Sequence, residues 1–183
     1  MFEQRLIYYC APTLAGLKTA GLFNTHGIPD AIVKQEANRL TGLLADCGLA
    51  LRLFAKKDRA TLVYLYRESD LARDLANPDV QAFLLTYGYQ LETIDTALDS
   101  LEKRIQTCPA FPHEVGVFLS YPLEDVKSFI ALGGAQCLLC GHWCAYSETE
   151  NAQLCFNRYD RCSHCYRNLY RRGHRLPELA VAR

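Results

Sequence analysis

Three apolar residues at every second position, followed shortly by a proline, constrain the fold of this chain most strongly. Val115, Val117 and Leu119 occupy alternate positions, which is the period-2 pattern of a strand with one face turned to a core. Pro122 follows, and its fixed φ suits the first position of a helix. The pattern predicts a central strand over residues 114–120 that leads directly into a helix.

Helical and strand periodicities recur along the rest of the chain. Apolar residues at steps of four and three from Val33 to Cys47 predict an amphipathic helix that Gly48 ends. Residues 49–53 and 62–67 have the composition and alternation of strands, which predicts a hairpin connected through Lys56-Lys57-Asp58-Arg59. We also expect helices over 2–10 (interrupted by Pro12 and Gly16), 69–76, 78–87, 91–105 and 149–172, and short strands before Asn24 and over 138–146.

These elements follow no strict strand–helix–strand order, which favours an α+β fold. We expect a mixed, mainly antiparallel sheet of four or five strands packed by helices. At 183 residues, half of them apolar, the chain can bury a core of its own. The sequence therefore predicts a single domain over 1–183, with a cysteine-rich C-terminal segment at about 137–172.

The charge balance excludes some classes of partner. Twenty basic and twenty acidic residues cancel, so no overall field attracts nucleic acid or an anionic membrane. No segment approaches the ~20 apolar residues of a membrane-spanning helix, and no cleavage site follows the apolar N-terminal residues. We expect a cytoplasmic protein, whose nine cysteines are thiols or metal ligands rather than disulfides.

The cysteine spacing is the strongest chemical signal. Cys137 and Cys140 form one Cys-x2-Cys pair, and Cys162 and Cys165 form a second pair after 21 intervening residues. Four thiolates in two such pairs can hold zinc or an iron–sulfur cluster, and Cys144 offers an alternative ligand. Two other interpretations remain open, because cysteines on an apolar helix face can be buried free thiols and neighbouring thiols can form a redox dithiol.

A second group of residues has the chemistry of an acid–base site. His113 and Glu114 lie together at the start of the predicted strand, and histidine with a carboxylate can transfer a proton near neutral pH. Lys18 and Tyr121 are candidate assisting residues. In the alternative, His113 and Glu114 only order the entry of the strand, and Tyr121 anchors its hydroxyl to the backbone.

Three sequence strings carry a resemblance to a known family. They are CAPTLAGLKTAGLFN from Cys10, FPHEVGVFLSYPLEDVKSFI from Phe111 and GHWCAY from Gly141. Together they resemble the bacterial domain of unknown function 3793 family, from about Cys10 to the last helix. The resemblance implies a family and no established activity.

These observations favour a binding or accessory protein that is linked to metal or redox chemistry. One alternative is an enzyme that uses His113 and Glu114 in a cleft with Lys18 or Tyr121. Another is an interaction module that docks a flavodoxin-like or other redox partner. The partner would be a small molecule or a protein, and the sequence leaves the oligomeric state open.

Overall fold

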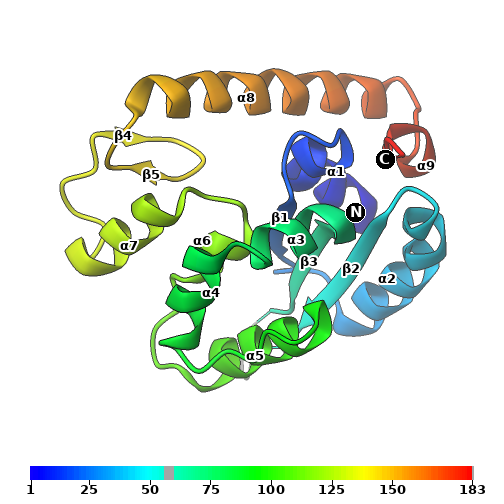
Figure 1. Cartoon of the computed structure of the whole chain (residues 1–183). Helices are drawn as coiled ribbons and strands as arrows, with labels where there is room; N and C mark the ends of the chain where they lie inside the picture. The colour runs from blue at the N-terminus through cyan, green and yellow to red at the C-terminus, as the bar shows by residue number, and fades with distance from the viewer. Residues whose placement is uncertain (56–59, 183) are drawn as a thin grey trace.

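The computed structural model describes residues 1–55 and 60–182 and has an α+β fold (Figure 1). A three-stranded antiparallel sheet has the order β1-β3-β2, and a separate two-stranded antiparallel sheet pairs β4 with β5. The strands are β1 (Ala20–Asn24), β2 (Leu49–Phe54), β3 (Leu62–Arg67), β4 (Leu139–Cys140) and β5 (Cys144–Ala145).

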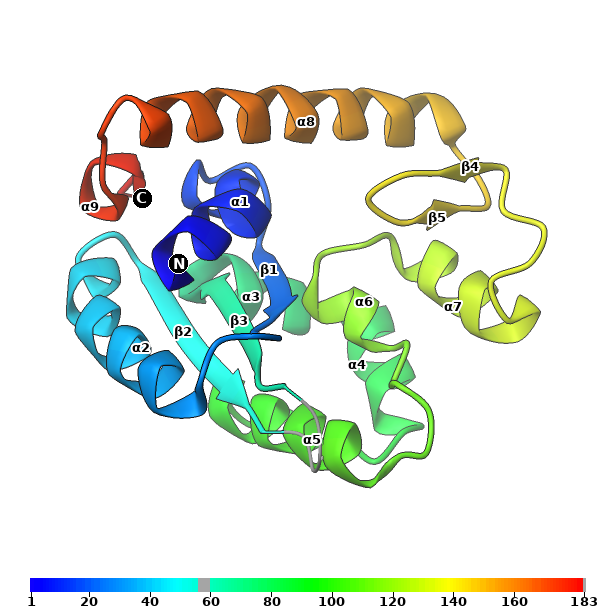
Figure 2. The ribbon, with the colours of Figure 1, turned by 180° about the vertical axis from the view of Figure 1, so that it is seen from behind.

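Helices make up most of the remaining described structure. They are α1 (Phe2–Leu14), α2 (Asp30–Ala45), α3 (Glu68–Leu75), α4 (Pro78–Leu85), α5 (Ile94–Thr107), α6 (Val115–Phe118), α7 (Leu123–Leu132), α8 (Thr149–Arg171) and α9 (Leu176–Leu179). The long helix α8 passes over α1 and joins the β4–β5 hairpin at one end to α9 at the other (Figures 1 and 2). No described helix combines the length and the hydropathy needed to cross a bilayer.

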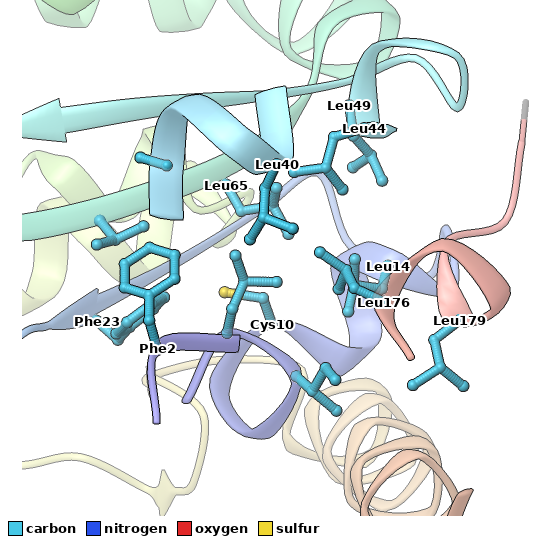
Figure 3. Close-up of a cluster of buried hydrophobic side chains, with 14 of the residues drawn as sticks. Phe2, Cys10, Leu14, Phe23, Leu40, Leu44, Leu49, Leu65, Leu176 and Leu179 are labelled. Carbon is cyan, nitrogen blue, oxygen red and sulfur yellow. The ribbon is translucent and has the colours of Figure 1, made fainter. Parts of the chain in front are cut away.

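The three-stranded sheet separates two hydrophobic cores. Val63 and Leu65 of β3 face a first core formed with α1, α2 and α9, part of which is shown in Figure 3. Tyr64 and Tyr66, on the opposite face of β3, belong to a second core formed with α3, α4, α5 and α6. Because successive side chains of a strand point to opposite faces, β3 is buried on both sides.

Most local predictions are confirmed. The hairpin of β2 and β3 is present, although its predicted connection, Lys56-Lys57-Asp58-Arg59, lies outside the described residues. Helix α2 ends at Ala45, and Gly48 follows with a φ of 67°, a conformation that favours glycine. The long C-terminal helix runs from Thr149 to Arg171 as expected.

Helix α1 is longer than predicted, because it passes through Pro12 and ends at Leu14. A proline inside a helix costs ~3 kcal/mol through the missing N–H and a steric clash. Thr13 and Leu14 are fully buried in the fold. Burial of the last turn between the sheet and α8 offsets the cost of the proline, which local propensity alone does not predict.

The predicted central strand over 114–120 is wrong. Val115–Phe118 form the one-turn helix α6, whose amides donate to carbonyls three or four residues earlier, as from Val117 N to Glu114 O at 3.0 Å. All four residues are buried, so the segment has no exposed face that a half-buried strand would show. A short apolar run of this kind does not distinguish a strand from a buried helical turn.

The predicted single sheet of four or five strands is therefore also wrong. The segment predicted as one strand over 138–146 turns back on itself at Gly141–Trp143 and forms the small β4–β5 hairpin. Two sheets of three and two strands replace the single sheet. The helix after Pro122 is present and ends at Gly133, which has a φ of 59°.

A buried arginine connects segments that are distant in sequence. Arg67, 1% exposed, donates to the carbonyls of Thr13 at 2.8 Å, Leu14 at 2.7 Å, Val181 at 2.8 Å and Cys47 at 3.3 Å. A guanidinium offers five donors in one plane and stays charged at any physiological pH. Arg67 therefore holds the end of α1, the loop after α2 and the C-terminal segment at the end of β3.

We predict that Arg67→Met lowers the free energy of unfolding by at least ~3 kcal/mol, because four carbonyls each lose a hydrogen bond from a charged donor. Urea unfolding followed by circular dichroism measures the change. The exposed Arg161 on α8 provides the control, since Arg161→Met should alter stability by no more than ~0.5 kcal/mol. Equal unfolding midpoints for the two variants would contradict the role assigned to Arg67.

Candidate metal centre

The β4–β5 hairpin is held by a small number of close contacts. Leu138 N donates to Ala145 O at 3.0 Å, and Gly141 N donates to Trp143 O at 3.0 Å across the turn. A Cβ atom at Gly141 would lie 2.3 Å from the ring of Phe156, a separation that no side chain tolerates. Glycine at this position lets the turn lie directly against α8.

Asp125 of α7 fixes the other side of the hairpin. The residue is 4% exposed, and its carboxylate accepts hydrogen bonds from Trp143 Nε1 and from Tyr146 N, each at 2.8 Å. Trp143 also packs edge-on against Phe156, with ring centroids 4.5 Å apart. The hairpin is thus anchored between α7 and α8 by one carboxylate and one aromatic contact.

Three cysteines meet at this hairpin. The sulfurs of Cys137, Cys140 and Cys144 all lie within 4.8 Å of one another, and Cys140 and Cys144 are direct partners across the two strands. Thiolates that share one zinc ion lie ~3.8 Å apart, given Zn–S bonds of ~2.3 Å at tetrahedral angles. The observed spacing therefore needs little adjustment to place all three sulfurs on one ion.

The crowding of the thiols has an electrostatic consequence. Burial, followed by the neighbouring thiols of Cys137 and Cys140, raises the pKa of Cys144 to about 12. Three thiolates at this separation repel one another, whereas a bound divalent cation favours the deprotonated form of each. The donor set is chemically suited to a cation that binds sulfur.

Tyr146 adds an unsatisfied polar atom beside the cluster. Its hydroxyl is buried and has no hydrogen-bond partner among the described residues, and its backbone N–H is held by Asp125. Burial first, and then the thiols of Cys144 and Cys137, raise the pKa of the phenol. A buried hydroxyl without a hydrogen-bond partner lowers the stability of the fold. The periodicity of the sequence did not indicate this buried hydroxyl.

The second predicted cysteine pair does not join this group. Among the residues that the structure describes, the cluster contains Cys137, Cys140 and the alternative ligand Cys144, and it leaves out Cys162 and Cys165. Cys162 packs against the first core from α8, and Cys165 is exposed on the same helix. The described structure brings together three of the five cysteines that the spacing singled out.

A cavity of about 220 Å³ adjoins the cysteines. Cys140 and Cys144 form part of its wall, and most of the remaining wall is apolar, including Val126 and Phe129. His113 also lines it, with its ring edge-on to Phe129 at a centroid distance of 4.9 Å. The predicted histidine therefore lies on the same cavity as two of the thiols.

Glu114 lies in a different environment from His113. It is 2% exposed, forms an ion pair with Arg104, and accepts a hydrogen bond from Tyr89 OH at 3.2 Å. Of these two partners of the Glu114 carboxylate, Tyr89 belongs to the second core and Arg104 lies on α5. The contacts of Glu114 are those of a residue that anchors α6 to α5.

Lys18 and Tyr121 lie close together. The Lys18 ammonium lies 4.7 Å from the ring centroid of Tyr121 and 5.9 Å from that of Tyr159. Burial lowers the pKa of Lys18 to about 8, while the thiols of Cys10 and Cys155 act in the opposite direction. Tyr121 lines the cavity and Lys18 does not, so a shared catalytic role for His113, Glu114, Lys18 and Tyr121 stays a prediction.

Comparison with known proteins shows the family. A family model described as "Protein of unknown function (DUF3793)" matches residues 6–180. The chain belongs to this family. The match covers nearly the whole chain and confirms the resemblance carried by the three sequence strings. No curated protein and no solved structure matches the chain of this DUF3793 member.

We predict that Asp125→Ala loosens the hairpin of this DUF3793 protein. Hydrogen bonds to a carboxylate contribute ~1.5–3 kcal/mol each, so the loss of two should speed amide hydrogen exchange over 138–146 at least tenfold. Glu124→Ala is the matched control, because Glu124 is exposed on the same turn and pairs with Lys127 at the surface. Unchanged exchange in Asp125→Ala would show that the hairpin is held by other contacts.

Proposed function

We propose that the protein binds one divalent metal ion, with zinc favoured, through the thiolates of Cys137, Cys140 and Cys144. The single observation that carries the proposal is the approach of the three sulfurs to within 4.8 Å of one another. Zinc accepts three thiolates with one further ligand in a tetrahedral site. This role agrees with a binding or accessory protein linked to metal chemistry.

The spacing of the sulfurs favours a single ion over an iron–sulfur cluster. In a cubane cluster each cysteine binds a different iron, so the cysteine sulfurs lie farther apart than sulfurs that share one ion. The upper limit of 4.8 Å fits the arrangement around one ion. The unsatisfied Tyr146 hydroxyl also supports the proposal, since outer-shell donors commonly accompany metal ligands.

The test is the metal content of protein purified anaerobically without chelators. We expect about one equivalent of zinc by elemental analysis, and we expect Cys137→Ser, Cys140→Ser and Cys144→Ser each to lose most of it, because each removes a thiolate ligand. Less than about a tenth of an equivalent of zinc or iron in the wild-type protein would contradict the proposal.

Cys165→Ser provides the matched control. Cys165 is exposed on α8 and belongs to the pair that the sequence also predicted as ligands. Its replacement should leave the metal content unchanged. Loss of metal in Cys165→Ser as well would restore the four-cysteine site and would show that α8 and the hairpin come together differently.

A second candidate function is a redox dithiol, because Cys140 and Cys144 face each other across the two strands. Facing residues of an antiparallel pair can have Cβ atoms at the separation that a disulfide needs. Mass spectrometry after thiol alkylation distinguishes the two functions. A Cys140–Cys144 disulfide in metal-free protein that reduces and reforms reversibly would favour the redox function.

A further inference from the structure

Within the described part of the chain, the three cysteines leave one position of a tetrahedral ion without a protein ligand, and the adjoining cavity lies beside two of them. We propose that this position opens into the cavity and takes the sulfur of a small thiol that has an aromatic or other apolar body. The inference rests on the proposed function and specifies the ligand class of the same site.

The described residues provide no fourth ligand of the usual kinds. Among the described histidine, cysteine, aspartate and glutamate residues, only Cys137, Cys140 and Cys144 belong to the cluster. His113 lines the cavity, but both His113 and His142 lie outside the cluster. Sites with three protein ligands and one open position are the ones that accept an external ligand at the metal.

The cavity is placed to receive that ligand. Cys140 and Cys144 both contribute to its wall, so the cavity reaches the sulfurs that would hold the ion. The exposed side chains of His113 and Cys140 lie at its outer edge, whereas Val115 and Val126 are buried within it. A ligand can therefore enter from solvent and reach the ion beside Cys140 and Cys144.

The side chains that line the cavity favour a ligand whose non-sulfur part is apolar. Val126, Phe129 and Trp143 supply aliphatic and aromatic surface, and both carboxylate oxygens of Asp125 already accept hydrogen bonds from the hairpin. A dry apolar cavity of about 150 Å³ can hold benzene, so the space of about 220 Å³ can hold a substituted ring.

The donor atom follows from the ligands already present. A centre with three thiolates prefers soft donors, and sulfur is the softest donor common in biological ligands. On binding, the thiol loses its proton to the bulk solvent, and its sulfur forms a bond to the ion in place of a water molecule. No electron transfer and no further reactant are needed.

The experiment uses the full-length protein loaded with Co²⁺ in place of zinc, because thiolate–cobalt bonds give visible and near-ultraviolet bands. Thiophenol is the probe, and phenol is the control with the same ring and an oxygen donor. We expect thiophenol to increase the thiolate-to-cobalt charge-transfer band by about a third, from three thiolates to four. The change should saturate at one equivalent with cobalt retained on ultrafiltration.

A cavity variant tests where the probe binds. Phe129→Ala removes a ring from the wall and should weaken thiophenol binding at least tenfold, because the ring of the probe loses an aromatic contact. Leu154→Ala is the matched control, since Leu154 is 68% exposed on α8 and does not line this cavity. It should bind thiophenol as the wild-type protein does.

Several outcomes would overturn the inference. They are an unchanged spectrum with thiophenol, an equal response to phenol, release of cobalt to the thiol, or equal affinity in Phe129→Ala. A ligand-free cobalt spectrum that changes in His113→Ala would place the imidazole on the ion and would also overturn it. Failure of the wild-type protein to bind cobalt or zinc would instead overturn the proposed function, and the inference with it.

Discussion

The buried guanidinium of Arg67 is the interaction on which the rest of the structure depends. Its N–H groups donate hydrogen bonds, in place of water, to carbonyls at the end of α1, in the loop after α2 and in the C-terminal segment. Thr13 O also accepts from Gly16 N, and Leu14 O from Val181 N, so Arg67 adds a second, charged donor to these two carbonyls. Hydrogen bonds to a charged group contribute ~1.5–3 kcal/mol each. Because α1 is held in this way, α8 can pack along it with α9 at one end and the cysteine hairpin at the other (Figure 1).

The hairpin shows how few contacts are needed to assemble the candidate site. Asp125 holds Trp143 and Tyr146 from α7, and Gly141 permits contact with Phe156 of α8. These two attachments fix Cys140 and Cys144, and the preceding turn brings Cys137 beside them. The same attachments form the wall of the cavity, so the metal position that we propose and its access from solvent have a common structural origin.

Local periodicity predicted the elements that carry a long or regular pattern. Helix α5 has a buried stripe at Leu98, Leu101 and Ile105, and the hairpin of β2 and β3 alternates over enough residues to specify its faces. The pattern at Val115–Leu119 is shorter and is buried all round. For such a segment the surrounding helices decide between strand and helical turn, since both conformations bury the same apolar side chains. The predicted single sheet was wrong partly for this reason, although five strands are present, divided between two sheets.

The sequence by itself determined that cysteines recur at close spacing after Cys137, and that α8 would be a long helix with cysteines along it. Only the tertiary structure decided that Cys144 joins Cys137 and Cys140, while Cys162 and Cys165 remain on α8 outside the cluster. The spacing of a Cys-x2-Cys pair indicates that the two thiols of that pair can lie close together in one turn. Whether the two pairs meet each other depends on how the hairpin docks on α7 and α8, through Asp125 and Phe156, and those long-range contacts leave no periodic signal in the chain.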